Sequence, residues 1–78
     1  MIVKRRSRLA VLLLRVIDAR KPMKLQSIVD KCAPGEPLWR WREVAESGVR
    51  RAVLYRERRD VYGYTVLGKE AGNGRRRR

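Results

Sequence analysis

The side chains that could carry out acid–base, nucleophilic or metal chemistry are few in this sequence. Histidine is absent, and Cys32 is the single cysteine. Glu43 and Glu46 lie three residues apart, a spacing that is common among carboxylates on a solvated helix face. A metal site needs a cluster of cysteine, histidine or carboxylate ligands, and no such cluster stands out. The sequence therefore predicts no enzyme, no metal, no cofactor and no small-molecule ligand.

Arginine is the residue type that offers binding chemistry. It supplies 16 of the 21 basic residues, and the formal net charge is +13 with a pI near 11.4. Such an excess of charge favours polyanionic partners, and the planar guanidinium group matches phosphate and guanine. Nucleic acid is the first expectation, followed by acidic membrane surfaces or acidic proteins.

The length of 78 residues predicts one domain, which a single cysteine cannot staple with an internal disulfide. The longest apolar run, 9–14, is far shorter than the roughly 20 residues that cross a bilayer. Arg15 and Asp18 follow it at once without a small-residue cleavage site, so a secretion signal is not expected. We therefore predict an intracellular protein, cytoplasmic or nucleoid-associated.

The first element that the sequence predicts is a helix over 7–19, which follows a basic arm at 1–6. Ser7 suits its N-cap. Five apolar residues at helical spacing form one stripe on this helix: Leu9, Leu12, Leu13, Val16 and Ile17. Val11 and Leu14 fall outside the centre of that stripe. They are either covered by neighbouring elements or form the seam of a homodimer through this helix.

A second, shorter helix is predicted over 25–31. Four residues share one face there: Leu25, Ile28, Val29 and Cys32. This pattern makes Cys32 a small buried apolar residue, and a reactive thiol is the alternative interpretation. The turn-forming residues of 33–37 then end the segment.

A third helix is predicted over 37–47, with Pro37 near its first position and Gly48 in a left-handed conformation after its end. Its periodicity places Trp41 on the inner stripe and leaves Trp39 facing outward. Across the whole domain we expect one core, made of Leu9, Leu12, Leu13, Val16, Ile28, Val29, Trp41 and Val44.

The C-terminal third has the pattern of a β-hairpin. Residues 49–56 and 61–65 are rich in β-forming types, and the charged residues 56–60 lie between them as a tip. Glu57 and Asp60 are expected to orient the arginines of the tip through ion pairs. The segment 68–71 suggests a short turn, and 72–78, which ends in four arginines, is predicted as a disordered tail.

Three helices followed by a two-stranded hairpin is a mainly α, α+β arrangement that resembles the winged helix-turn-helix domain. Three segments carry the resemblance: 25–32 is similar to the first helix of the helix-turn-helix pair, 44–51 to the passage from recognition helix to wing, and 64–71 to the end of the second wing strand. The resemblance covers 7–71. It implies a small DNA-binding protein that regulates transcription, with helix 37–47 in the major groove and the 56–60 tip on the backbone or in the minor groove.

The resemblance also implies roles for individual residues. Arg40 is expected to read a base, Arg42 to contact a phosphate, and Trp39 to stack or to pack under the wing. Glu43 either accepts from a cytosine amino group or belongs to a solvated helix face. The remaining nucleic-acid-binding candidates are basic residues of the hairpin, its approach and the tail: Arg50, Arg56, Arg58, Arg59, Arg75, Arg76, Arg77 and Arg78.

Two other functions stay open at this point. Small basic winged-helix domains also bind RNA, so an RNA-binding or ribosome-associated protein is one alternative to double-stranded DNA. The other is a protein-interaction module, in which the same helix and wing contact an acidic partner. A membrane-surface role is the weakest, because the first helix does not divide into a basic and an apolar face.

Overall fold

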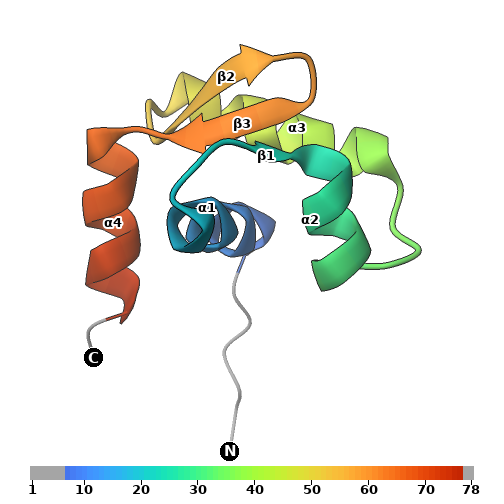
Figure 1. Cartoon of the computed structure of the whole chain (residues 1–78), viewed down its shortest axis with the longest axis horizontal. Helices are drawn as coiled ribbons and strands as arrows, with labels where there is room; N and C mark the ends of the chain where they lie inside the picture. The colour runs from blue at the N-terminus through green and yellow to red at the C-terminus, as the bar shows by residue number, and fades with distance from the viewer. Residues whose placement is uncertain (1–6, 77–78) are drawn as a thin grey trace, which may run out of the picture.

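The computed structural model describes the backbone of residues 7–76 and the side chains of residues 7–72. It is a compact α+β domain of four helices and a three-stranded antiparallel sheet (Figure 1). In chain order the elements are α1 Arg8–Ala19, β1 Met23–Lys24, α2 Leu25–Cys32, α3 Leu38–Arg50, β2 Leu54–Arg58, β3 Val61–Tyr64 and α4 Val66–Arg76.

The sheet has the order β1-β3-β2 and covers one side of α1, with α2 and α4 at opposite sides of that helix (Figure 1). β3 pairs with both neighbours: Met23 lies opposite Tyr62 on one side, and Arg56 lies opposite the same residue on the other. A β-bulge between Arg56 and Arg58 shifts the β2–β3 register just before the turn. The hairpin is short and packs against α3 and α1.

The start of α1 follows from its N-cap, as the sequence predicts. The Ser7 hydroxyl oxygen accepts a hydrogen bond from the Ala10 N–H at 3.1 Å, which satisfies one of the free amides of the first turn. Arg20 ends the helix in the left-handed conformation, with its N–H donating to the Ile17 and Val16 carbonyls. The described helices include none that is both long and apolar enough to cross a membrane.

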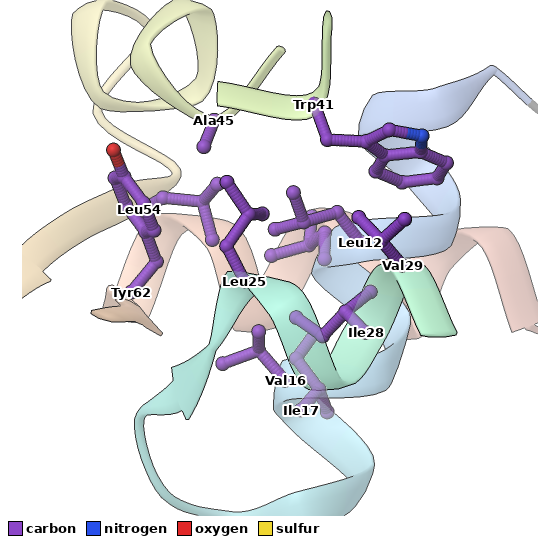
Figure 2. Close-up of a cluster of buried hydrophobic side chains, with 11 residues drawn as sticks. Leu12, Val16, Ile17, Leu25, Ile28, Val29, Trp41, Ala45, Leu54 and Tyr62 are labelled. Carbon is purple, nitrogen blue, oxygen red and sulfur yellow. The ribbon is translucent and has the colours of Figure 1, made fainter. Parts of the chain in front are cut away.

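The core forms where apolar faces of α1, α2, α3 and the sheet converge (Figure 2). Of the eight predicted core residues, six are buried, and Leu9 and Val44 are half-buried at its margin. Leu54 and Tyr62 complete it from the sheet. The phase predicted for α3 is confirmed, because Trp41 is 2% exposed while Trp39 is 55% exposed.

The end of α3 differs from the prediction. Gly48 does not take a left-handed conformation but continues the helix, which ends at Arg50. A Cβ at Gly48 would lie 2.6 Å from Leu54 Cδ1 and 2.9 Å from Leu9 Cδ1, so the glycine lets β2 and α1 approach the helix. The chain reverses instead at Ala52, with φ of 64°, and the first hairpin strand starts at Leu54 rather than at residue 49.

The tip of the hairpin is also narrower than predicted. Arg56 and Arg58 belong to β2, and only Arg59 and Asp60 lie in the turn. Asp60 has φ of 59°, a left-handed conformation that aspartate tolerates better than most residues. Two of the three arginines predicted at the tip therefore project from a strand.

The sequence did not predict β1 or α4. Residues 66–76 are helical where a turn and the start of a disordered tail were expected; Arg75 and Arg76 lie in this helix, whereas Arg77 and Arg78 lie outside the described residues. Thr65 caps α4, because its hydroxyl oxygen accepts from the Gly68 N–H at 3.0 Å while the hydroxyl donates to the Ala52 carbonyl at 2.6 Å.

The position of α4 explains why α1 is apolar on more than one face. A Cβ at Gly72 would lie 2.4 Å from Ile17 Cδ1 and 3.4 Å from Leu14 Cδ2, so α4 packs directly against this side of α1. Leu14 is 5% exposed as a result. Its place outside the main stripe thus has an explanation within one chain, while the homodimer stays a prediction.

Candidate nucleic-acid interface

The exposed side of α3 forms a ridge between two hollows, and we call this ridge the crest of α3. A hollow of about 580 Å³ is lined by Trp39, Arg42, Glu43, Glu46 and Arg50. A second hollow, of about 510 Å³, lies toward the start of α1 and has as its charged lining Arg8, Arg40, Glu43, Arg50 and Arg51. Glu43 and Arg50 line both hollows, which places them on the crest itself. The helix therefore stands clear on two sides, with arginines along each.

Trp39 and Arg40 act as a pair near the N-terminal end of this crest. The Arg40 guanidinium carbon lies 5.5 Å from the centroid of the Trp39 ring, within the range of a cation–π interaction. Two roles were predicted for Trp39, stacking and packing under the hairpin. Its large exposure favours stacking. The pair presents an aromatic ring with a guanidinium group over it.

Arg42, which the sequence suggested for a phosphate contact, is already engaged. Its Nε donates to Asp60 Oδ1 and its Nη2 to Asp60 Oδ2, both at 2.9 Å. The hydrogen bond from Arg42 holds the pKa of the Asp60 carboxyl below its usual range, and the Arg42 pKa is raised in turn. The Asp60 carbonyl also accepts from the Leu25 N–H at 2.8 Å. Asp60 therefore fixes the hairpin turn to α3 and to the first residue of α2.

The arginines of the hairpin keep their side chains exposed. Arg56 Nη1 is 3.8 Å from Glu46 Oε2, and Arg58 Nη1 is 4.0 Å from Glu57 Oε2. Exposed ion pairs of this length contribute little, so both guanidinium groups stay accessible to a stronger partner. Arg59 is exposed in the turn. Glu57 and Asp60 were both expected to orient the arginines of the tip. Glu57 contacts Arg58, whereas Asp60 forms its ion pair with Arg42 of α3.

Two further carboxylates link the elements of the candidate interface, and neither role was predicted from the sequence. Glu36 Oε1 accepts from Arg8 Nε at 3.1 Å and from Trp41 Nε1 at 2.8 Å. Both hydrogen bonds lower the Glu36 pKa, and the bond from Arg8 has the larger effect. Glu46 Oε2 accepts from the Tyr62 hydroxyl at 2.6 Å. Glu36 ties α1 to the start of α3, and Glu46 ties the middle of α3 to β3. Arg8 is 28 residues from Glu36, and Tyr62 is 16 residues from Glu46, so neither hydrogen bond had a local signal in the sequence. Only Trp41, five residues from Glu36, is a local partner.

Tyr62 gives the domain a predicted dependence on alkaline pH. Its side chain is buried at 1% exposure, and this burial, with the hydrogen bond to Glu46, raises the Tyr62 pKa from 10.0 to about 12. The folded state thus favours the protonated phenol. This contribution is complete below pH 10 and is lost as the pH rises to about 12, so we expect the free energy of unfolding to fall by roughly 2 kcal/mol across that window.

Urea unfolding at a series of alkaline pH values measures this effect. Lysines titrate in the same range, so the matched control is Tyr62→Phe, which keeps the ring and removes the ionisable hydroxyl. The natural protein should be more stable than Tyr62→Phe below pH 10, and this advantage should shrink and then reverse as the pH rises. Parallel pH profiles for the two proteins would contradict the assignment.

Cys32 is half-buried, with the Arg15 Nε 3.2 Å from its sulfur. Among residues 7–72, no group of three or more cysteine, histidine or acidic side chains is placed to hold a metal ion. Comparisons of the chain with protein-family models, with curated proteins and with solved structures found no match. The inference about function therefore depends on the geometry of the chain itself.

Proposed function

We propose that this chain is a winged helix-turn-helix domain that binds double-stranded DNA, with α3 in the major groove and the β2–β3 hairpin on the adjacent backbone or minor groove. The order of elements supports this, because α2 and α3 are followed directly by a hairpin that packs against α3 and α1. The chain carries a net charge of +13, which suits a polyanionic partner.

The crest of α3 between its two hollows is the observation that carries the proposal. The major groove, about 12 Å wide, admits an α-helix whose two sides then face the phosphates of opposite strands. Arg8, Arg40 and Arg51 line the hollow on one side of α3, and Arg50 lies on the crest. On the other side, Arg56 lies 3.8 Å from Glu46 and the hairpin turn is bonded to Arg42, and Glu46 and Arg42 both line that hollow. Trp39, Arg40 and Glu43 lie in the N-terminal half of α3, which is the part closest to the base edges in such a complex.

The pairing of Arg42 with Asp60 assigns that arginine a different task from the phosphate contact first expected. A bidentate guanidinium–carboxylate pair fixes both distance and orientation. It holds the hairpin turn at one position relative to α3, so that both elements can engage one duplex at once. Arg42 is therefore a positioning residue in this proposal.

A salt titration of DNA affinity tests the proposal. Each phosphate that a cation neutralises contributes about 0.9 to the slope of log affinity against log salt. We expect the double variant Arg58→Ala/Arg59→Ala to flatten that slope by about 2 and to weaken binding to all duplexes alike. The control is Lys69→Ala, an exposed cation on α4, which should leave the slope unchanged.

Three results would count against the proposal. An unchanged slope in the double variant would show that the hairpin arginines are only solvated. An equal change in Lys69→Ala would show that overall charge, not this surface, governs binding. A clear preference for duplex RNA in a competition titration would favour the RNA-binding alternative.

A further inference from the structure

A small hollow on the sheet, away from the crest of α3, combines aromatic rings with positive charge. It has a volume of about 250 Å³ and is lined by Arg20, Lys21, Pro22, Tyr55, Gly63 and Tyr64. We call it the tyrosine hollow. β1 pairs only with Val61 and Tyr62 of β3, so at Gly63 and Tyr64 the sheet has two strands instead of three. The hollow lies at this two-stranded part. Both hollows beside α3 contain carboxylates, whereas the charged side chains of this one are all basic.

Gly63 determines how Tyr55 presents its ring. The two residues lie opposite each other in the β2–β3 pair, and a Cβ at Gly63 would lie only 2.6 to 2.7 Å from the Cζ, Cε2 and hydroxyl of Tyr55. The phenol ring therefore rests on the backbone of Gly63 in the place where a side chain would otherwise stand. Tyr55 is still 42% exposed, so the other side of the ring faces solvent. The result is an aromatic platform whose position the sheet fixes.

The basic residues beside this platform come from the segment between α1 and β1. Arg20 is held in the left-handed conformation that ends α1, with its N–H bonded to two carbonyls, and Lys21 follows it. Both side chains are exposed, and both line the hollow with Tyr55. An aromatic face beside two cations matches a ligand that has a flat ring and a negative charge a short distance apart.

We propose that the tyrosine hollow binds one unpaired nucleotide of a single strand, with the base stacked on Tyr55 and its phosphate held by Arg20 and Lys21. The base must be unpaired, because neighbouring base pairs cover both faces of every base inside a duplex. A volume of 250 Å³ is below the range of complete small-molecule sites, which fits one unit of a polymer. This site goes beyond duplex binding by α3 and does not depend on it.

The test is the binding of the full chain to a labelled oligothymidylate and to a strand of equal length in which every base is absent. The second strand keeps the phosphates and removes the stacking. We expect Tyr55→Leu to weaken oligothymidylate binding by roughly 5- to 100-fold, the range for one lost base–aromatic stack, and to leave binding to the abasic strand unchanged. Tyr55→Phe, which keeps the ring, should bind both strands as the natural protein does.

Lys21→Ala provides a second measurement that does not depend on the Tyr55 variants. It should reduce the salt slope on both strands by about 0.7, the value for one phosphate contact on a single strand. Thermal unfolding followed by circular dichroism checks that each variant is folded. If Tyr55→Leu does not fold, the salt slope of Lys21→Ala tests the proposal by itself, and a slope equal to that of the natural protein overturns it.

Other outcomes also overturn it. Equal affinity of Tyr55→Leu and the natural protein for oligothymidylate would show that no base stacks there. An equal loss on the abasic strand would show that the substitution acts through charge or folding. Competition by polyglutamate as effective as that by oligothymidylate would point to an acidic peptide. If the Tyr55 effect appears but no variant of α3 or of the hairpin alters duplex binding, the proposed function fails and the tyrosine hollow stands.

Discussion

Gly68→Ala is expected to lower the free energy of unfolding by about 3 kcal/mol. In an exposed helix the same substitution would stabilise by up to about 1 kcal/mol, because alanine is the better helix former. The sign reverses here because a Cβ at Gly68 would lie 2.0 Å from the Val53 carbonyl oxygen and 2.9 Å from its carbon. Backbone atoms cannot move aside by changing rotamer. The first turn of α4 would have to shift and to weaken the Thr65 N–H bond to the same carbonyl, now 3.1 Å long.

Chemical denaturation of Gly68→Ala beside Gly72→Ala provides a matched comparison within α4. The alanine methyl at Gly72 would meet Ile17 Cδ1, which is the far end of a flexible side chain. We therefore expect a change of about 1 kcal/mol or less there, since the rotamer can adjust. Equal stabilities for the two variants would show that α4 does not approach Val53 as closely as the structure places it.

Arg40→Ala is expected to lower the affinity for the preferred duplex by about 1–3 kcal/mol, and to have little effect on random DNA. Arg40 is exposed in the N-terminal half of α3, and the Trp39 ring restricts its guanidinium group. A restricted side chain loses less conformational entropy when it binds, which favours a bidentate contact with guanine. This prediction depends on the proposed placement of α3 in the major groove.

The measurement begins with selection of the preferred sequence from random duplexes, followed by titration of that duplex and of a random one. Arg51→Ala is the matched control, because Arg51 lines the same hollow but follows the last residue of α3. It should weaken both duplexes by a similar factor, as a phosphate contact does. If Arg40→Ala also weakened both equally, Arg40 would be a phosphate ligand and the base reader would have to be sought elsewhere on the crest.

The sequence by itself determined the three apolar helix stripes and therefore the helical part of the core. Helical periodicity placed Leu12 and Val16 inside and separated buried Trp41 from exposed Trp39. Ser7 marked the start of α1 through a cap that involves only the next three residues. These features were predictable because each depends on neighbours within one or two turns of the chain.

The basic character of the crest was also visible in the sequence, but the state of each arginine was not. Arg40 and Arg50 are exposed as expected, while Arg42 is held by Asp60, 18 residues away. Nothing in the local pattern shows which of Arg40 and Arg42 will be paired, since both lie outside the buried stripe of the same helix. Which one is paired depends on where the hairpin turn comes to rest.

The tertiary structure alone decided the roles of the glycines. Gly48, Gly68 and Gly72 have the local signature of turns and helix ends, yet all three lie inside helices. Each marks a close approach to a segment from elsewhere in the chain: Gly48 to Leu54, Gly68 to Val53, and Gly72 to Ile17. The cost of glycine in a helix is only about 1 kcal/mol, so the apolar packing of α4 against α1 outweighs it. Such packing joins residues that are distant in sequence, and therefore no local pattern could reveal it.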